Sequence, residues 1–399
     1  MVSISYTSAA AAAAAAEAPL VHVAFSSGAS HFVACTAAGL HVFSCDGSVE
    51  RVHYRCNATV ASGGGEVTCA ELLTRSNLAV AIRRPNATDG AAGVYGVHFL
   101  EGRRGETVTV KSFRTPGLGA VGGVRLLGDH MLVAGEKKAT LVKNGDPQDK
   151  EEKATGPNPL GLCALAWPDV YRVIDQATLV YALPREEKGA VQVCRSGVPG
   201  SVDVRAHESR VACIALSRDG RLLATAGSKG TLLRIFSTDD GTKLQELRRG
   251  TDRADIHCIV FSPDSKWLAV SSDKATVHVF RVADVDLPSS TPDGNVDVLP
   301  AAAAAPPPAA ATPPAPAKAN QGSSLSFLKG YLPGYFSSEW SLAQFRLPEG
   351  VKYSVAFGRQ QPNTILIIGT DGSFYRCQFD PVDAGDMVQL EHRKFMKIK

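Results

Sequence analysis

The sequence has little excess of charge of either sign and no long run of strongly apolar residues. Its 42 basic and 39 acidic residues leave a net charge of +3, whereas general nucleic-acid binding calls for a strong basic excess. No stretch of 18 strongly apolar residues predicts a transmembrane helix. The first twenty residues, MVSISYTSAAAAAAAAEAPL, lack the basic start of a secretory signal. We therefore expect a cytoplasmic protein that does not bind nucleic acid, with a low-complexity Ala-rich tail over residues 1–19.

Motifs for metal binding and catalysis are missing as well. The nine cysteines include no CxxC pair and no cluster with histidines, which argues against a zinc site or a disulfide framework. Several lie inside apolar segments such as VACIAL and IHCIVF, where a free cysteine usually acts as a small core residue. The chain shows no nucleophile motif and no dinucleotide fingerprint. The sequence therefore predicts a protein that is not an enzyme and has no cofactor or metal.

The sequence does contain an internal repeat. VACIALSRDGRLLATAGSKGTLLRIF begins at Val211 and IHCIVFSPDSKWLAVSSDKATVHVF begins at Ile256, an offset of 45 residues. Each follows the order apolar strand, Ser-x-Asp turn, apolar strand, polar turn, alternating strand. Repeats of about 40–45 residues with four strands are typical of β-propeller blades of the WD-repeat kind. Weaker copies cover residues 21–43, 67–84, 124–143, 162–183 and 353–379.

These seven windows predict an all-β fold, a seven-bladed β-propeller over residues 20–393. One blade cannot bury both faces of its small sheet, but a closed ring of blades can. Residues 285–338 interrupt the pattern with a Pro/Ala-rich stretch, AAAAAPPPAAATPPAPAKA, that cannot form a packed core. Because blade-like sequence lies on both sides, we expect a long disordered loop between the third and fourth strands of blade six.

The last part of this loop, SSLSFLKGYLPGYFSSEW, carries apolar and aromatic side chains at short intervals. Two interpretations stay open for it. It could be a hydrophobic wedge that inserts into a membrane interface, or the side chains could pack on blade six. The membrane-insertion residues would be Leu328, Tyr331, Leu332, Tyr335 and Phe336.

Two adjacent arginines, Arg248 and Arg249, lie between the two best repeats in the stretch LRRG. Successive side chains of a strand point to opposite faces, so each arginine would serve its own pocket. Gly250 would let the backbone approach a ligand closely. Guanidinium groups bind phosphate through paired, charge-assisted hydrogen bonds, and the neighbouring turns AGSKGT and SSDKAT supply hydroxyls. The alternative is a solvated strand end beside ordinary β-turns.

LRRG, preceded by KGTLLRIF and followed by SSDKATVHVF, resembles the signature of the phosphoinositide-binding propellers called PROPPINs, or WIPI proteins in animals. The likeness is strongest over residues 205–282 and is found again at 326–345. It implies two binding sites at the rim of blades five and six for phosphatidylinositol 3-phosphate and the 3,5-bisphosphate. The first site would comprise Arg248, His207, Ser228 and Thr231, and the second Arg249, Ser271, Ser272, Thr276 and His278. The sequence departs from the family pattern at Gly227, where serine is usual, and at Ala275, where glycine is usual.

The resemblance also implies a function: a non-catalytic effector that recruits autophagy machinery to the forming autophagosome. Such a protein would attach peripherally to preautophagosomal and endosomal or vacuolar membranes and hold the lipid-transfer protein of autophagy there. The alternative is a generic WD-repeat scaffold that binds only proteins, for example a ubiquitin-ligase adaptor. LRRG between two matched turns favours the effector, since a generic scaffold has no reason to carry it.

Overall fold

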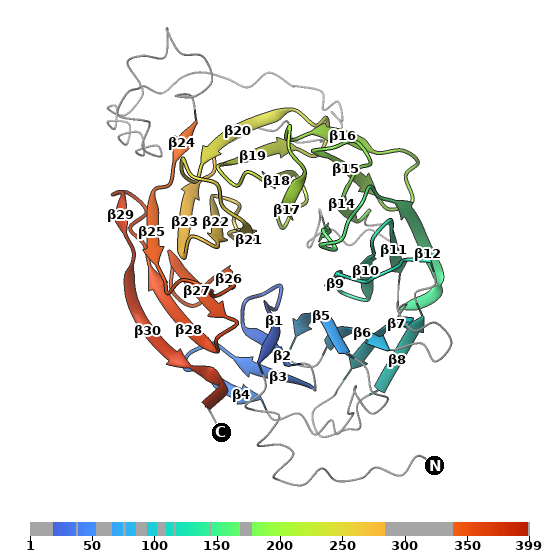
Figure 1. The fold of residues 1–399 in the computed structure, drawn as a ribbon, viewed down its shortest axis with the longest axis horizontal. Coiled ribbons are helices and arrows are strands. Elements are labelled where there is room, and N and C mark those ends of the chain that lie inside the picture. Colours follow the sequence, from blue (N-terminus) through green and yellow to red (C-terminus); the bar gives the residue numbers. More distant parts are fainter. Residues whose placement is uncertain are drawn as a thin grey trace, which may run out of the picture.

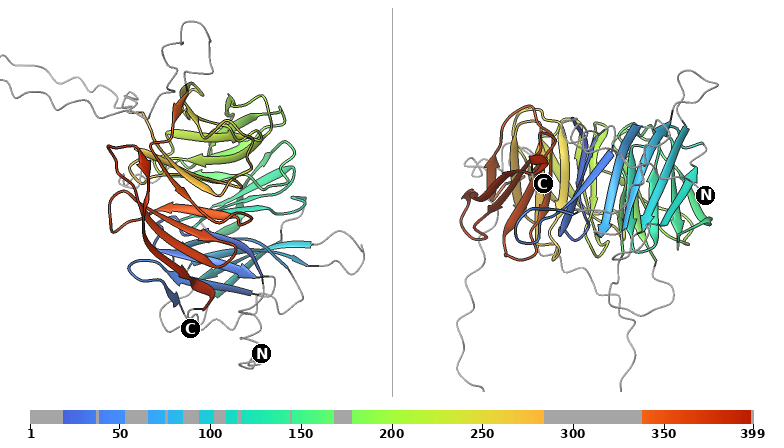
Figure 2. Two further views of the ribbon diagram at one scale, coloured as in Figure 1. Left: turned by 60° about the vertical axis from the view of Figure 1, so that its left-hand side comes forward. Right: turned by 90° about the horizontal axis from the view of Figure 1, so that it is seen from below.

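The computed structural model describes residues 19–36, 39–52, 66–74, 77–84, 94–101, 109–114, 117–143, 145–167, 178–283 and 338–397. Within these ranges the chain forms β-strands and one short 3-10 helix, η2 (Phe395–Lys397). The strands build seven mainly antiparallel sheets, numbered 1 to 7 here in chain order, which surround a common axis (Figure 1). Seen edge-on, the strands cross the thickness of the ring (Figure 2). The prediction of an all-β propeller is confirmed.

Each sheet is built mainly from strands that follow one another in the chain. Sheet 1 contains β1 (Leu20–Phe25), β2 (His31–Thr36), β3 (Gly39–Ser44) and β4 (Glu50–Val52), and sheet 2 contains β5 (Glu66–Thr74), β6 (Asn77–Arg84), β7 (Val94–Glu101) and β8 (Thr109–Arg114). Sheet 3 contains β9 (Gly123–Leu127), β10 (His130–Ala134), β11 (Lys138–Lys143) and β12 (Asp146–Ala154), and sheet 4 contains β13 (Ala164–Ala166), β14 (Val180–Pro184), β15 (Ala190–Arg195) and β16 (Val202–Arg205). Sheet 5 contains β17 (Val211–Leu216), β18 (Leu222–Gly227), β19 (Leu232–Ser237) and β20 (Lys243–Arg248). Sheet 6 contains β21 (Ile256–Phe261), β22 (Trp267–Ser272), β23 (Thr276–Arg281) and β25 (Ala343–Arg346), and sheet 7 contains β26 (Tyr353–Phe357), β27 (Thr364–Gly369), β28 (Ser373–Gln378) and β30 (Val388–Lys394).

Two very short strands add to the outer edges of neighbouring sheets. β24 (Glu339–Trp340) pairs in parallel with β20 of sheet 5, and β29 (Gly385–Asp386) pairs in parallel with β25 of sheet 6. Residues 284–337 lie between β23 and β25, the third and fourth strands of sheet 6. The chain that leaves sheet 6 therefore returns along the edge of sheet 5 before it completes sheet 6.

The two best repeats fold in the same way. Ser217 donates its hydroxyl to Asp219 and accepts the backbone N–H of Leu222, while Ser262 does the same with Asp264 and Trp267. This Ser-x-Asp arrangement fixes the tight turn between the first and second strands, because the serine hydroxyl bonds both the aspartate and a backbone N–H of the turn.

The core lies between neighbouring sheets rather than within any one of them. Seven apolar clusters fill the gaps between successive sheets, including the gap between sheets 7 and 1. Middle strands such as β18 and β27 are buried at every position, because both of their faces contact another sheet. This explains why their sequences, LLATAG and TILIIG, are nearly continuous apolar runs.

Sheets 7 and 1 meet without a shared strand. Among the described strands, sheet 1 is built only from the N-terminal strands β1–β4 and sheet 7 only from strands of the C-terminal part. An aromatic cluster of Phe32, Phe43, Phe374 and Phe395 closes this gap instead. Side-chain packing, rather than backbone pairing, therefore closes the ring.

The predicted membrane-insertion residues Leu328, Tyr331, Leu332, Tyr335 and Phe336 lie outside the described residues. The same holds for the Ala-rich tail over residues 1–18. Among the residues that the structure describes, no helix has the length and apolar character needed to cross a membrane.

Candidate functional site

Both arginines of LRRG are buried at the outer edge of sheet 5. Arg248 is the last residue of β20, and it and Arg249 expose only 6% and 7% of their surface. The returning strand β24 covers this edge, with Leu247 opposite Glu339 and Arg248 opposite Trp340. Two buried cations at a strand end do not fit the alternative of a solvated terminus, since arginine is rarely buried without a specific role.

The two guanidinium groups have different surroundings. Arg248 donates from Nε to the hydroxyl of Ser338, at 2.9 Å. Arg249 donates from Nε to the carbonyl oxygen of Gly230, at 2.9 Å, and from its terminal nitrogen to the carbonyl oxygen of Asp252. One arginine is therefore directed towards β24 and the other towards the turns that flank β20, as the alternation of strand side chains predicts.

The residues predicted to accompany Arg248 belong to sheet 5 and the segment before it. His207 shares a hydrogen bond of 2.9 Å between Nε2 and the hydroxyl of Thr225. Ser228 donates its backbone N–H to Arg210, while the carbonyl of Thr231 accepts the backbone N–H of Arg249. Thr231 thus bonds the backbone of the second arginine. The side chain of Arg248 donates to Ser338, the last residue of the loop predicted over residues 285–338.

The residues predicted to accompany Arg249 lie at the ends of β22 and β23. His278 is 8% exposed and bonds through Nδ1 to the hydroxyl of Ser341, at 3.0 Å. Ser272 accepts the backbone N–H of Lys274, and Thr276 donates to the carbonyl of the same residue. Ser271 has a different role: it is 1% exposed, and its hydroxyl donates to the carbonyl of Tyr353 in sheet 7, at 2.6 Å. Ser271 links two sheets, and its hydroxyl is already engaged there.

The two departures from the family pattern have local explanations. A Cβ atom on Gly227 would lie 2.6 Å from the hydroxyl oxygen of Ser209 and 3.0 Å from the ring of His207. Ser209 therefore occupies the space that a serine at position 227 would need, a residue that sequence reasoning missed. Ala275 adopts a φ of +51° and donates its N–H to Ser272. It keeps a left-handed turn of the kind that usually requires glycine.

Burial and two nearby carboxylates act on Arg249 in opposite directions. Burial lowers the pKa of Arg249, and the carboxylates of Asp273 and Asp252 oppose this effect. Asp273 is itself engaged, since it accepts the backbone N–H of Asp255 and lies 3.9 Å from Lys274. Burial also lowers the pKa of His278 to about 4, with Arg249 adding to the shift. At neutral pH His278 is a neutral hydrogen-bonding group next to a buried cation.

This histidine leads to a prediction for stability against pH. The pKa of His278 is about 4 in the folded protein against 6.5 for the ordinary value, so the unfolded chain binds the extra proton between these limits. The contribution of neutral His278 to the free energy of unfolding is therefore fully present above pH 6.5 and is lost as the pH falls towards 4. Urea unfolding of His278→Asn between pH 4.5 and 6 should show a slope of stability against pH that is smaller by about 1 kcal/mol per pH unit. Equal slopes for the variant and the parent protein would contradict this assignment.

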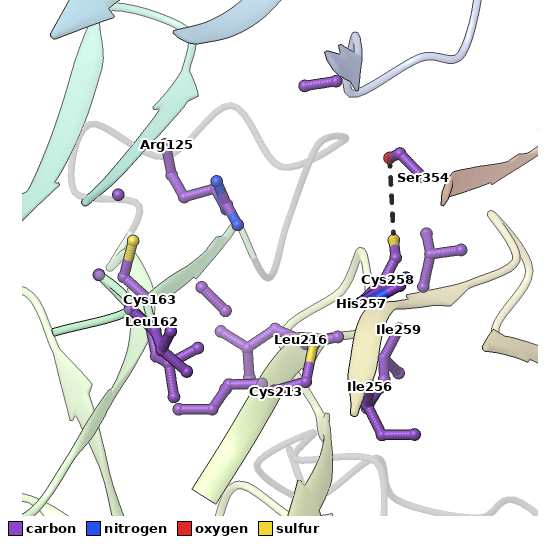
Figure 3. A pocket seen from close by; sticks show the side chains of 18 of the residues that line it. Arg125, Leu162, Cys163, Cys213, Leu216, Ile256, His257, Cys258, Ile259 and Ser354 are labelled. Atoms are coloured by element: carbon purple, nitrogen blue, oxygen red, sulfur yellow. Dashed lines mark hydrogen bonds between the residues drawn. The ribbon is translucent and has the colours of Figure 1, made fainter. Parts of the chain in front are cut away.

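A second candidate site is the cavity along the axis of the ring, with a volume of about 1590 Å³. The innermost strands line it, and Figure 3 shows Arg125 and several cysteines around it. Glu71 pairs with Arg125 at 3.5 Å, while burial raises the pKa of Glu71 to about 7. Burial raises the pKa of Cys163 to about 11 and that of Cys213 to about 12, so these thiols are protonated. Thiols in this state are poor nucleophiles and metal ligands, and no three potential ligands cluster within the described ranges.

The chain is similar in sequence to a known protein family. The PROPPIN family model matches residues 20–297. Autophagy-related protein 18e of Arabidopsis thaliana is 34% identical over 381 residues, which cover 95% of this chain and 89% of that protein. Autophagy-related protein 18 of Dictyostelium discoideum is 28% identical over 282 residues, 67% of this chain and 68% of that protein.

Solved structures share the fold at lower identity. Kluyveromyces lactis Hsv2 superposes with a TM-score of 0.63 and 19% identity, covering 94% of this chain and 99% of that one. A complex of KlAtg21 with the coiled-coil of AgAtg16 gives a TM-score of 0.63 at 18% identity, with the same coverage. The family match and the Arabidopsis relative extend over most of the sequence, and the chain therefore belongs to the PROPPIN family.

Proposed function

We propose that this chain is a non-catalytic, seven-bladed phosphoinositide effector that recruits autophagy machinery to the forming autophagosome. It would bind phosphatidylinositol 3-phosphate and phosphatidylinositol 3,5-bisphosphate through two sites at the rim of sheets 5 and 6, one for each arginine. The observation that carries the proposal is the buried pair Arg248–Arg249, whose guanidinium groups point to different partners. These bonds use the Nε–H of each arginine and one terminal nitrogen of Arg249, and the proposal assigns phosphate binding to the guanidinium groups as well.

Each arginine would anchor one phosphoinositide headgroup. Arg248 with His207, Ser228 and Thr231 would form the first site, and Arg249 with Ser272, Thr276 and His278 the second. Paired N–H groups of a guanidinium match two phosphate oxygens. The hydroxyls and neutral histidines would bond the inositol ring and the remaining phosphate oxygens.

Gly250 supports this arrangement. No atom lies within 4 Å of the position where its Cβ would stand, so the backbone beside the two arginines is accessible from outside. A phosphate could approach there without displacing protein atoms. Ser209 would add a hydroxyl to the first site in the place where Gly227 lacks one.

Membrane attachment would combine these sites with the apolar segment over residues 323–338. Leu328, Tyr331, Leu332, Tyr335 and Phe336 would insert as a wedge, with aromatic rings at headgroup depth. Each contact alone would be weak, but several on one protein bind a membrane together. The result would be reversible, peripheral attachment to preautophagosomal and endosomal or vacuolar membranes.

A protein partner completes the proposed role. The family resemblance suggests the large lipid-transfer protein of autophagy. The complex of KlAtg21 with the coiled-coil of AgAtg16 supports the idea that propellers of this fold hold a protein while they act in autophagy. The relatives from Arabidopsis and Dictyostelium carry autophagy in their names.

Vesicle flotation tests the proposal. The protein should float with phosphatidylcholine vesicles that contain phosphatidylinositol 3-phosphate or the 3,5-bisphosphate, and remain at the bottom with phosphatidylcholine alone. Vesicles with phosphatidylinositol 4-phosphate control for simple charge attraction. Equal flotation on all vesicles, or flotation on none, would contradict the proposed function.

A further inference from the structure

Gln245 is a buried polar residue of β20 that contacts the chain at the end of β23 and the short edge strand β24. It exposes 7% of its surface. Its Nε2 donates to the carbonyl oxygen of Arg281, at 3.2 Å, and to the carboxylate of Glu339, at 3.0 Å. Its Oε1 accepts the backbone N–H of Ala283, at 3.0 Å. Both donors of the amide and its acceptor are thus satisfied.

These three contacts bring together the two places where the chain leaves and re-enters the described part of sheet 6. Arg281 ends β23 and Ala283 follows it, while Glu339 begins β24. A parallel strand of two residues has few backbone bonds, so β24 depends on side-chain contacts to keep its place. Gln245 provides one such contact to Glu339.

The next residue in this chain of contacts is Ser338. It is 1% exposed, precedes Glu339, and accepts the hydrogen bond from Nε of Arg248. Arg248 lies three residues after Gln245 on the same strand. A single short segment, Ser338–Trp340, is therefore held by Gln245 and in turn holds the guanidinium group of Arg248.

We propose that Gln245 is a positioning residue for the first arginine of LRRG. By fixing Glu339, it keeps the hydroxyl of Ser338 against Arg248, which sets the orientation of the guanidinium group before any ligand arrives. A pre-oriented guanidinium binds phosphate more tightly, because less side-chain freedom is lost on binding. The consequence for lipid headgroups rests on the proposed function, whereas the orientation of Arg248 does not.

Two substitutions separate the contacts of Gln245. Gln245→Glu keeps an oxygen for the N–H of Ala283 but loses the donors and places a second carboxylate beside Glu339. Gln245→Leu loses all three bonds. Gln192→Leu is a matched control, since Gln192 of β15 is equally buried and donates to the carbonyls of Ala154 and Pro184, away from the arginine pair.

The first measurement needs no lipid. Hydrogen exchange of peptides covering residues 339–342 should speed up roughly tenfold in both Gln245 variants, and exchange at Ala283 should speed up in Gln245→Leu much more than in Gln245→Glu. The Nε–H resonance of Arg248, observed by NMR with labelled arginine, should lose its protection in both. Gln192→Leu should change none of these. Unchanged protection of Arg248, or a rise spread equally over β17–β19, would overturn the proposal.

The second measurement uses the soluble headgroup inositol 1,3-bisphosphate, with affinities from calorimetry. Gln245→Leu and Ser338→Ala should each weaken binding about tenfold, and the double variant should be no weaker than either, because both act through Arg248. If hydrogen exchange changes in the Gln245 variants but their affinity for the headgroup equals that of the parent protein, Gln245 only links strands, and the proposal is overturned. Failure of the parent protein to bind the headgroup would refute the proposed function instead, and the lipid-free measurements would still decide whether Gln245 positions Arg248.

Discussion

Replacing Arg248 and Arg249 together by threonine is expected to abolish flotation on vesicles that contain phosphatidylinositol 3-phosphate. Each guanidinium would supply a pair of charge-assisted hydrogen bonds to phosphate, and hydrogen bonds to charged groups contribute about 1.5–3 kcal/mol each. Loss of even one such bond at each of two sites lowers the combined affinity by at least about 100-fold. Binding curves over a series of lipid concentrations would measure this difference.

The single variants test whether there are two sites. If each arginine serves its own headgroup, Arg248→Thr and Arg249→Thr should each leave measurable flotation, weaker than that of the parent protein. If both served one pocket, either substitution alone would give the full loss. The different surroundings of the two side chains favour the first result.

Two controls guard against a trivial explanation. The double variant also removes the hydrogen bonds of the arginines to Ser338, Gly230 and Asp252, so its thermal unfolding must be compared with that of the parent. Arg376→Thr is a matched change in sheet 7, where Arg376 donates to the backbone carbonyls of Cys45 and Gly47. It should leave flotation unchanged. A folded double variant that floats like the parent protein would refute the lipid role of LRRG.

The sequence predicts the propeller because the fold is encoded locally and repeatedly. The 45-residue offset places Ser217 and Ser262 in equivalent turns, and the apolar runs of β18 and β27 indicate strands buried on both faces. Patterns of this kind depend only on neighbours along the chain. They can therefore be recognised in the sequence before the arrangement of the sheets in the ring is known.

The site was predictable only in part, because its remaining contacts join distant segments. Alternation along β20 was enough to predict different surroundings for Arg248 and Arg249. The partner of Arg248, Ser338, is 90 residues away in sequence and arrives by a parallel pairing of only two residues. Gln245 was missed for the same reason, since its partners are 36 to 94 residues away in sequence. For Ser271 the sequence suggested a contact that the structure does not favour. Its polar turn motif pointed to a ligand-facing hydroxyl, but this hydroxyl donates to the carbonyl of Tyr353 in sheet 7.

Ring closure leads to the second large expected effect. Phe395→Ala is expected to lower the free energy of unfolding by about 3–5 kcal/mol, the usual cost of truncating a fully buried phenylalanine. Phe395 is 0% exposed, and its ring contacts those of Phe32 and Phe43 edge to face, with centroids 4.9 and 5.1 Å apart. Urea unfolding followed by fluorescence and circular dichroism would measure the change.

The same substitution tests how the ring is held together. Met396, the next residue, is only partly buried against the same cluster, so Met396→Ala should cost less than half as much. Because no described strand joins sheets 7 and 1 by backbone pairing, loss of the Phe395 ring should also speed hydrogen exchange in β1, β2 and β30 before it affects β17–β20. Equal costs for the two variants would show that the aromatic cluster does not close the ring. Hydrogen exchange that rises first in sheet 5 would show that the ring opens most easily beside the arginine pair. Ring opening and the proposed lipid binding would then depend on the same interface.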